Sequence, residues 1–376
     1  MSAPVPPFSS ADHAHMARAL RLAEGGLYTA DPNPRVGCVV VRDGAVVGEG
    51  FHARAGEPHA EVHALNAAGE AARGATAYVT LEPCSHHGRT PPCAEALVAA
   101  GVARVVVAMA DPNPLVAGQG TTRLAEAGIE TATGLMAAEA EALNPGFVRR
   151  MRDGRPHVRL KMAASLDGRT ALANGESQWI TGPDARADVQ RLRARSSALI
   201  TGIGTVLSDD PRLTARVAEA VNHPLRVVLD PHLSMPPDAG MLREPGRTLV
   251  VTTADGQEAK AAAAALTEAG AEVIQSGGRA NDAVDLPALL EYLAAHEETN
   301  EVLVETGATL AGAFIHAGLW DELILYLAPH LMGDAARGLF HLPALDAMDQ
   351  RIGLTIDDIR AVGADWRLRA VPAGEA

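Results

Sequence analysis

The stretch VGCVVVRDGAVVGEG, residues 36–50, decides the fold class of the N-terminal half. It contains two valine-rich runs, residues 36–41 and 45–50, which are separated by Arg-Asp-Gly. Valine favours strands because its branched side chain packs well on a pleated surface, and Asp-Gly is a strong turn signal between two strands. The stretch therefore predicts a β-hairpin.

The segments around this hairpin alternate between helical and strand patterns. Helices are expected at residues 11–24, 93–101 and 118–128 and from about Pro58, and strands at residues 75–81 and 103–109. A hairpin followed by alternating elements is typical of a sheet with helices on both faces. The pattern predicts a three-layer α/β domain that closes near Asn144.

The segment NPGFVRRMRDGRP, residues 144–156, is polar, basic and interrupted by proline and glycine. Such a composition predicts a linker. Beyond it the alternation begins again, with strands expected at residues 157–165, 197–202, 225–230, 248–253, 301–306 and 323–331 and helices near residues 183–194 and 257–270. The sequence therefore predicts two α/β domains, residues 1–146 and 157–376, with a linker at residues 147–156.

Composition bounds the class of protein. The chain has 376 residues, more than one hydrophobic core usually supports, and it is 47% apolar and 21% charged, as globular proteins are. It has three cysteines and shows no signal peptide or long apolar run, so we expect a cytoplasmic protein without a membrane span. The net charge of −14 disfavours nucleic acid as a partner and favours a small substrate.

The stretch LEPCSHHGRTPPC, residues 81–93, indicates a metal site together with an upstream histidine. His59, Cys84 and Cys93 supply one imidazole and two thiolates, a set that leaves tetrahedral zinc one open position. Glu61 lies two residues after the histidine. A His-x-Glu pattern followed by Pro-Cys is typical of zinc nucleobase deaminases, in which the glutamate transfers protons. The pattern favours a catalytic zinc site with Glu61 as general acid and base.

Other interpretations of these residues remain open. His63 could form an i, i+4 zinc clamp with the first histidine, although Glu61 lies at the wrong offset for the protease motif His-Glu-x-x-His. Cys84 and Cys93 could form a disulfide, or they could be unrelated core or surface residues. Cys38 stands in the middle of a valine run, so we expect it to be a small core residue.

The spacing of the two cysteines points to a particular family. Eight residues separate them here, whereas two separate those of the general deaminase motif. This long loop and several other segments closely resemble the bifunctional riboflavin biosynthesis deaminase-reductases. The segments are DPNPRVGCVVV, GEGFHARAGEPHAEVHAL, AYVTLEPCSHHGRTPPC, DPNPLVAG, SLDGRTA, GESQWITG, GTVLSDDPRLTAR and ETGATLAGAFI. The resemblance covers about residues 12–335 and implies a cytidine-deaminase-like three-layer α/β domain followed by a dihydrofolate-reductase-like α/β domain.

For the N-terminal domain, the resemblance implies deamination of a diaminopyrimidinone that carries a phosphoribosylamino group. Zinc on His59, Cys84 and Cys93 would lower the pKa of its water, and Glu61 would move the protons. By the same resemblance, the residues that line the substrate pocket are Asn33, His52, His86 and Arg89.

For the C-terminal domain, the resemblance implies reduction of the ribosyl group to ribityl with NADPH. The residues expected to contact NADPH are Ala163, Trp179, Thr205, Asp209, Gly307, Ala308, Thr309, Leu310, Ala311, Gly312 and Ala313. The last seven follow a valine-rich strand and open a helix, where backbone N–H groups could bind a phosphate. The residues expected to contact substrate are Ser177, Arg193, Leu213, Arg216 and Glu305.

Lys161 lies among apolar residues in RLKMAAS. A lysine near the sugar could polarise its oxygen during hydride transfer, so we expect Lys161 to be catalytic. The alternative is an ordinary lysine on an edge strand.

Two other functions stay open at this point. The chain could be a single-function nucleoside or tRNA deaminase with an accessory C-terminal domain, although the long cysteine loop and the acidic charge count against it. It could instead be a non-catalytic zinc scaffold, but a structural site needs no general base and normally has a fourth protein ligand. The resemblance implies small phosphoribosyl pyrimidine substrates and a homo-oligomer, with no nucleic acid or membrane partner.

Overall fold

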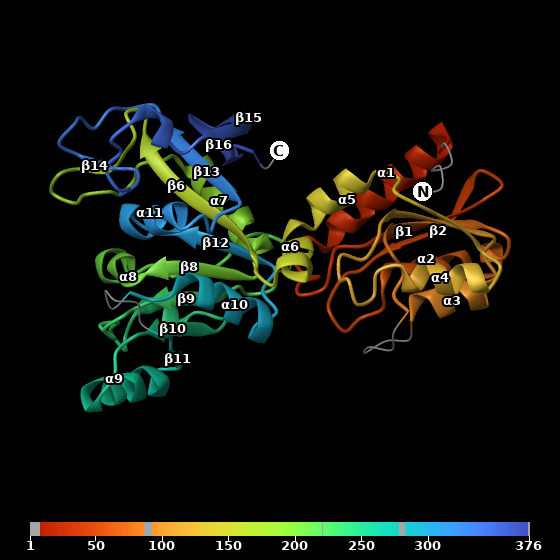
Figure 1. The fold of residues 1–376 in the computed structure, drawn as a ribbon, viewed down its shortest axis with the longest axis horizontal. Helices are drawn as coiled ribbons and strands as arrows, with labels where there is room; N and C mark the ends of the chain where they lie inside the picture. The colour runs from red at the N-terminus through yellow and green to blue at the C-terminus, as the bar shows by residue number, and fades with distance from the viewer. Residues whose placement is uncertain (1–7, 86–91, 220, 278–282, 375–376) are drawn as a thin grey trace. The chain divides into compact units, whose positions relative to one another are not determined.

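The computed structural model of the chain describes residues 8–85, 92–219, 221–277 and 283–374. Contacts within the chain divide it into two compact units, Met1–Gly154 and Arg155–Ala376 (Figure 1). The division falls inside the segment that the sequence marks as a linker. Each unit has its own sheet and its own hydrophobic core.

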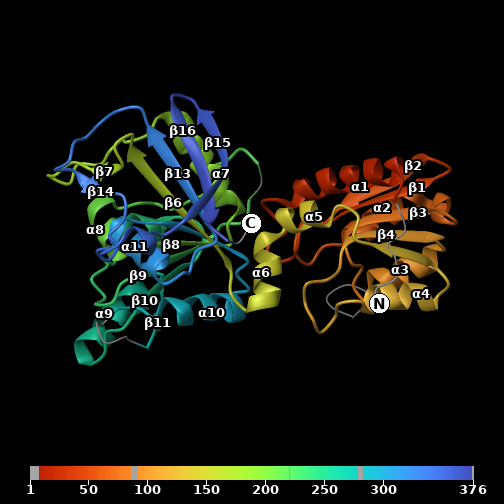
Figure 2. The same cartoon turned by 45° about the horizontal axis from the view of Figure 1, so that its top comes forward.

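The described residues of the N-terminal unit form one mixed sheet with helices on both faces. The strands are Gly37–Arg42 (β1), Ala45–Phe51 (β2), Thr76–Leu81 (β3), Arg104–Met109 (β4) and Glu130–Thr133 (β5), and the helices are Ser10–Ala23 (α1), Ala60–Ala68 (α2), Cys93–Ala100 (α3), Gln119–Glu126 (α4), Ala137–Leu143 (α5) and Pro145–Asp153 (α6). The strand order is β2-β1-β3-β4-β5, antiparallel up to β3 and parallel after it. Helices α1 and α5 lie on one face of the sheet and α2, α3 and α4 on the other (Figures 1 and 2). The predicted hairpin and three-layer arrangement are confirmed.

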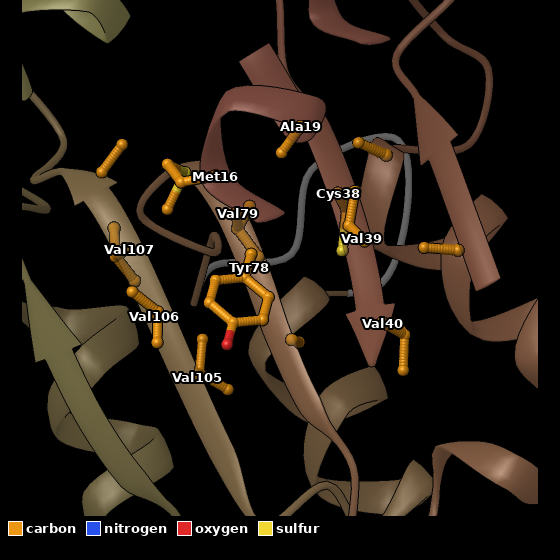
Figure 3. Packing of buried hydrophobic residues seen from close by; sticks show 14 of the residues in the cluster. Met16, Ala19, Cys38, Val39, Val40, Tyr78, Val79, Val105, Val106 and Val107 are labelled. Atoms are coloured by element: carbon orange, nitrogen blue, oxygen red, sulfur yellow. The ribbon is translucent and has the colours of Figure 1, made fainter. Parts of the chain in front are cut away.

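The core under α1 shows why the valine-rich runs become strands. Met16 and Ala19 of α1 lie beside valines of β1, β3 and β4 in a cluster of buried side chains (Figure 3). Cys38 is fully buried in the same cluster, which confirms that it is a core residue. A capping box between Ser9 and Asp12 begins α1 by satisfying backbone N–H groups at its first turn.

Glycines on β2 bring α2 close to the sheet. A Cβ atom at Gly48 would lie 2.1 Å from the carbonyl oxygen of Ala64, and one at Gly50 would lie 2.4 Å from Cβ of His63. Both contacts are shorter than any side chain tolerates, so the close approach of α2 requires glycine at these positions. The approach fixes the helix that carries His59 at its N-terminus.

The segment that the sequence predicts as a linker contains a helix. Residues Pro145–Asp153 form α6, with proline in its first turn and Gly154 at its C-terminus in the left-handed conformation. Proline at the start and glycine just past the end are typical helix boundaries as well as breaks between elements. A short strand and a short helix before it, β5 and α5, also escaped prediction because each offers few buried positions.

The described residues of the C-terminal unit form a larger, mostly parallel sheet. Its strands are His157–Ser165 (β6), Ala198–Gly202 (β8), Leu225–Leu229 (β9), Thr248–Thr252 (β10), Glu272–Gln275 (β11), Glu301–Glu305 (β12), Glu322–Ala328 (β13), Leu354–Val362 (β15) and Asp365–Pro372 (β16), in the order β11-β10-β9-β8-β12-β6-β13-β16-β15. Among the described residues, β16 alone runs antiparallel to its neighbours, β13 and β15, and the other pairings in this sheet are parallel. A separate pair, Arg169–Ala171 (β7) and Arg337–Gly338 (β14), stands apart from this sheet (Figure 2).

Helices cover both faces of the large sheet. They are Pro183–Arg195 (α7), Ile203–Asp209 (α8), Gln257–Glu268 (α9), Leu286–His296 (α10) and Ala308–His316 (α11). Apolar residues of α10 and α11 belong to one buried cluster, and those of α7, α8 and α9 belong to another. The sheet strands alternate their side chains between the two clusters, as strands covered on both faces do. No helix among the described ranges is long and apolar enough to span a membrane.

The two units are expected to fold as separate fragments, because each has its own buried core. Fragments 1–154 and 155–376 should each be soluble and unfold cooperatively in urea, followed by circular dichroism. A fragment that aggregates or unfolds without a transition would show that its core depends on the other unit.

Candidate functional site

Three potential metal ligands converge at one edge of the N-terminal sheet. His59 is the residue that caps the N-terminus of α2, Cys93 is the first residue of α3, and Cys84 follows the end of β3. Nδ1 of His59 lies 3.2 Å from Sγ of Cys93 and 3.7 Å from Sγ of Cys84, and all three ligand atoms lie within 4.8 Å of one another. A zinc ion with bonds of about 2.0–2.3 Å needs ligand atoms at this mutual separation.

The hydrogen bonds around Cys84 favour its deprotonated form, the thiolate. The backbone N–H of Cys93 donates to Sγ of Cys84 at 3.3 Å. The pKa of Cys84 falls to about 4, first because the Cys93 thiol donates a hydrogen bond to it, and further through His59 and this backbone N–H. A thiolate is the form that binds a metal. The donor set therefore fits zinc, with two thiolates and one imidazole and with no fourth protein ligand among the described residues.

The alternatives for these residues do not agree with the geometry. Cys84 and Cys93 are free cysteines, so no disulfide joins them. Within the described part of the chain, the group of clustered ligand atoms contains His59 and the two cysteines but not His63. The i, i+4 histidine clamp is therefore not formed.

Glu61 lies in the first turn of α2, directly beside the three ligands. Its side chain is only 3% exposed, and burial raises its pKa to about 7. A carboxyl group that titrates near neutral pH can both accept and donate a proton under physiological conditions. The position and the environment suit a general acid and base.

His52 and Asn33 adjoin the same site. His52 is buried, its Nε2 lies 3.0 Å from Nδ2 of Asn33, and its Nδ1 lies 3.2 Å from the carbonyl oxygen of Pro58. Its ring meets that of His59 edge-on with centroids 5.2 Å apart. His52 therefore lies beside the candidate ligand His59, and Asn33 contacts His52. The other two predicted pocket residues, His86 and Arg89, lie outside the described residues.

Sequence reasoning missed a residue that supports this site. Glu82 is buried at the end of β3, two positions before Cys84, and accepts several hydrogen bonds from the segment that leads into α4. Its place directly before Pro-Cys was the one available signal. A buried carboxylate with several donors has a positioning role by its geometry.

A second group of predicted residues comes together in the C-terminal unit. Glu305 ends β12 opposite Lys161 on β6, and Nζ of Lys161 lies 3.9 Å from its carboxylate. Arg193 on α7 holds the same carboxylate with two hydrogen bonds of 2.5 and 2.9 Å. Burial lowers the pKa of Lys161. Lys161 is thus paired inside the unit and is not a lysine on an edge strand, since β6 lies between β12 and β13.

Arg216 and Arg193 both donate hydrogen bonds to Thr214, so Arg216 lies near the pair formed by Lys161 and Glu305. Nη1 of Arg193 donates to the carbonyl oxygen of Thr214, and Nη1 of Arg216 donates to its hydroxyl at 2.7 Å. Burial lowers the pKa of Arg216, and repulsion from Arg193 and Arg212 lowers it further. Leu213 precedes Thr214 with a positive φ of 47°. The guanidinium groups of Arg193 and Arg216 therefore lie on two sides of Thr214.

The residues expected to contact NADPH occupy several elements. Thr205 and Asp209 are on α8, Ala163 is on β6 two residues after Lys161, and Gly307 caps the N-terminus of α11. The loops after β8 and β12 adjoin, since a Cβ atom at Gly202 would lie 3.6 Å from Oγ1 of Thr306. Two helix N-termini thus meet at the carboxyl edge of adjacent parallel strands, an arrangement that fits a dinucleotide phosphate.

The other residues predicted to contact NADPH or substrate lie on the segment before α7 and in α11. Trp179 is 70% exposed, and the Arg186 guanidinium lies 4.7 Å from its ring centroid. Ser177 is half-buried on the same segment before α7. In α11, Gly312 is buried and packs closely against His341. A Cβ atom at Gly312 would lie 2.0 Å from the carbonyl oxygen of His341. Ala311 is buried too, whereas Gly307, Thr309 and Ala313 are exposed, so only part of the predicted loop faces outward.

Family models match both halves of the chain. A model for the cytidine and deoxycytidylate deaminase zinc-binding region matches residues 9–109, and the RibD C-terminal domain matches residues 156–368. The predicted fold classes, deaminase-like and then reductase-like, are confirmed. A single-function deaminase with an unrelated accessory domain is not supported, because the second half matches a reductase family.

Whole-chain relatives agree. The riboflavin biosynthesis protein RibD of Escherichia coli is 52% identical over 96% of this chain and 100% of its own length, and that of Haemophilus influenzae is 46% identical over 98% and 99%. The solved structure of Acinetobacter baumannii RibD, form 1, has a TM-score of 0.90 at 47% identity and covers 96% of this chain and 99% of its own. A Thermotoga maritima structure, described as a diaminohydroxyphosphoribosylaminopyrimidine deaminase and 5-amino-6-(5-phosphoribosylamino)uracil reductase, has a TM-score of 0.83 at 32% identity, with the same coverages.

The matches cover nearly the full length of this chain and of each relative. Both the metal-ligand cluster and the reductase unit lie within the matched residues. The chain therefore belongs to the RibD family of riboflavin biosynthesis enzymes, with a zinc-binding deaminase domain and a reductase domain.

Proposed function

We propose that the N-terminal unit hydrolytically deaminates 2,5-diamino-6-(5-phosphoribosylamino)pyrimidin-4-one. The C-terminal unit then reduces the ribosyl group of the resulting 5-amino-6-(5-phosphoribosylamino)uracil to ribityl with NADPH. The observation that carries the proposal is the convergence of His59, Cys84 and Cys93 beside a buried Glu61, in one chain with a reductase unit. The Thermotoga maritima relative, described by both activities, supports the same substrates.

In the deaminase, His59, Cys84 and Cys93 would hold zinc. Bound zinc would lower the pKa of a water molecule and so supply a nucleophile near neutral pH. Glu61 takes a proton from the attacking water and delivers protons to the ring and to the departing amine, so that water and the amine become a carbonyl and ammonia. Because burial raises the pKa of Glu61 to about 7, this carboxyl group can gain and lose a proton near neutral pH.

Substrate recognition in this unit is assigned to His52 and Asn33. Their contact joins the loop before β1 to the strand end that leads to His59. Both side chains offer hydrogen bonds to the polar edge of a pyrimidine. His86 and Arg89 stay assigned to the same pocket by resemblance.

In the reductase, the N-termini of α8 and α11 would hold the phosphates of NADPH. NADPH would supply the hydride to the sugar carbon. Lys161 donates a hydrogen bond to the sugar oxygen and is oriented by Glu305, which Arg193 fixes in place. Arg216 binds the ribose phosphate, with Arg193 beside it on the other side of Thr214.

The limits of the two catalytic domains are proposed as residues 1–146 and 157–376. A homo-oligomer stays a prediction that rests on the resemblance, and a cytoplasmic location stays one that rests on the composition of the sequence. Small-molecule substrates follow from the enzyme class, and no partner of another kind is proposed.

Two assays on the purified chain test this function. Ammonia release should require zinc and should precede NADPH oxidation when the diaminopyrimidinone is supplied. Removing zinc with a chelator should stop ammonia release, while NADPH oxidation on the deaminated substrate continues, because the second reaction belongs to the other unit. A zinc-loaded chain that releases no ammonia would contradict the proposal for the first unit, and one that oxidises no NADPH would contradict it for the second.

Replacing Arg216 by alanine tests the reductase substrate site. The variant should lose about 2 kcal/mol of transition-state binding, which is about 30-fold in kcat/KM, mainly as a raised KM, because one phosphate contact is removed at a partly exposed site. Ammonia release and NADPH affinity should stay unchanged. Arg212→Ala is the matched control, since Arg212 is a more exposed neighbour that pairs with Glu244. Equal kinetics for the two variants would remove Arg216 from the site.

A further inference from the structure

Glu82 occupies an unusual place for a carboxylate. It follows directly after the buried strand β3, it is 6% exposed, and its backbone N–H donates to the carbonyl oxygen of Met109 on the neighbouring strand β4. Only Pro83 stands between it and the metal ligand Cys84. The mechanism proposed above gives this residue no role.

Both carboxylate oxygens of Glu82 accept hydrogen bonds from one segment, residues 111–121. Oε2 accepts from the backbone N–H groups of Asp111, at 3.2 Å, and Gly118, at 2.9 Å. Oε1 accepts from the backbone N–H of Thr121 at 3.1 Å and from its hydroxyl at 3.3 Å. All four donors are neutral, and three are main-chain groups whose burial without a partner is costly. The carboxylate therefore fixes the path of the whole segment that begins α4.

The same segment touches the chain on the ligand side of Glu82. A Cβ atom at Gly120 would lie 1.9 Å from the carbonyl oxygen of Pro83, so the first turn of α4 meets the peptide directly before Cys84. Ser85 donates a hydrogen bond to Oε1 of Gln119 at 3.4 Å. Residues on both sides of Cys84 thus contact the start of α4, and Glu82 holds that start in place.

The remaining contacts of Cys84 lead to the other thiol ligand. The carbonyl oxygen of Cys84 accepts from the N–H of Ala94 at 3.1 Å, and its sulfur accepts from the N–H of Cys93. The position of the Cys84 sulfur is therefore determined by the start of α3 on one side and by the start of α4 on the other. Glu82 is the group that connects α4 to this arrangement.

We propose that Glu82 is a positioning residue of the zinc site, which holds residues 111–121 against the Pro83–Cys84 peptide and so places the Cys84 thiolate for the metal. The inference rests on the proposed zinc deaminase site and deepens it. Glutamine at this position would keep one acceptor oxygen and would direct an NH2 group at backbone N–H donors. At least two of the four hydrogen bonds would then be lost, and the start of α4 would separate from the Pro83–Cys84 peptide.

The test is a zinc titration of the full chain by competition with a chelator. Glu82→Gln should bind zinc about 10–100-fold more weakly than wild type, the range found when groups that orient a metal ligand are removed. Its cobalt derivative should show a weakened or shifted thiolate-to-metal charge-transfer band, because that band reports the sulfur–metal geometry. Saturation with zinc should leave kcat of deamination below that of wild type.

Two further variants make the test specific. Glu130→Gln is the matched control, because Glu130 forms an exposed ion pair with Arg104 at 3.1 Å at the start of β4 and β5. It should keep zinc affinity within about two-fold of wild type. Thr121→Val removes a single hydroxyl donor and leaves the backbone donors, so it yields a folded variant even if Glu82→Gln does not accumulate. It should bind zinc more weakly than Glu130→Gln does.

Unchanged zinc affinity and an unchanged cobalt spectrum would overturn the inference, even if the variant melts at a lower temperature, because that result is what a purely structural role predicts. NADPH oxidation by the other unit reports that the chain is intact. The titration needs no substrate. Wild-type chain that binds zinc without releasing ammonia would contradict the proposed function alone, and Glu82→Gln that holds zinc like wild type would contradict this inference alone.

Discussion

Replacing Glu61 by glutamine is expected to reduce ammonia release by about a thousand-fold, while zinc stays bound at the wild-type stoichiometry. The amide has nearly the same shape but cannot accept and return the protons that the reaction moves. Glu61 is not among the three clustered ligand atoms, so the metal should remain. Steady-state ammonia release and zinc content, measured on the same preparation, check both parts.

The matched control for this variant is Glu57→Gln. Glu57 lies in the loop just before α2, is half-exposed and lies 4.0 Å from Arg54, so its loss should leave deamination unchanged. NADPH oxidation on the deaminated substrate should be normal in both variants. Substantial deamination by Glu61→Gln would remove Glu61 as the proton carrier, and loss of zinc would show that it supports the metal instead.

Replacing Arg159 by methionine is expected to destabilise the C-terminal unit by about 3–5 kcal/mol. Arg159 is 3% exposed on β6 and hydrogen-bonds the carboxylates of Glu301 on β12 and Glu322 on β13, so it connects the three adjacent strands. Methionine fills a similar volume without the charge. Two buried carboxylates would then lose the charge that they share, while Arg195 stays 3.2 Å from Glu301 and both Arg369 and His157 stay at Glu322. The loss is measured as the change in free energy of unfolding in urea.

The control for this prediction is Arg247→Met. Arg247 also joins two carboxylates, Glu272 and Glu297, but its side chain is 54% exposed. An exposed network of this kind contributes about 1 kcal/mol or less, because water and salt screen it. Equal destabilisation by the two variants would show that burial does not strengthen the Arg159 network.

The same network gives a pH dependence. Burial alone would raise the pKa of Glu322, but attraction to Arg159 and its other partners holds that pKa below the usual range. The stabilisation is therefore present above the unfolded-state pKa of about 4.3 and is lost as pH falls. In Arg159→Met the pKa of Glu322 should rise, so the midpoint of acid unfolding should move to higher pH.

Much of the fold is encoded in local patterns. Runs such as residues 36–41 and 103–109 are valine-rich because both faces of their strands are covered, and such runs read as strands without any tertiary information. The Asp-Gly turn signal likewise placed the hairpin. The sequence analysis did not predict the short β5 and the exposed β15, which have few buried residues. It also did not predict α10, although five of its residues are buried, or α6, where proline and glycine stand at helix boundaries.

The candidate site likewise contains residues that the sequence identifies and contacts that it does not reveal. His59, Glu61 and the two cysteines could be recognised because zinc chemistry demands those residue types, and the two halves of the motif each stand at the beginning of a helix. The geometry brings them together, with all ligand atoms within 4.8 Å. Lys161 was recognisable only as a charge among apolar residues, and its partner Glu305 lies far away along the chain.

The sequence by itself determined the two α/β units, the strand-forming runs and the candidate zinc ligands, because these depend on residue type, short spacing and periodicity. Only the tertiary structure decided which distant groups meet. It paired Glu82 with the start of α4, Arg193 with Glu305, and Arg159 with two carboxylates on adjacent strands. The physical reason is that such contacts follow from the order and register of strands. A charged side chain gives no local sign of the partner that makes its burial favourable.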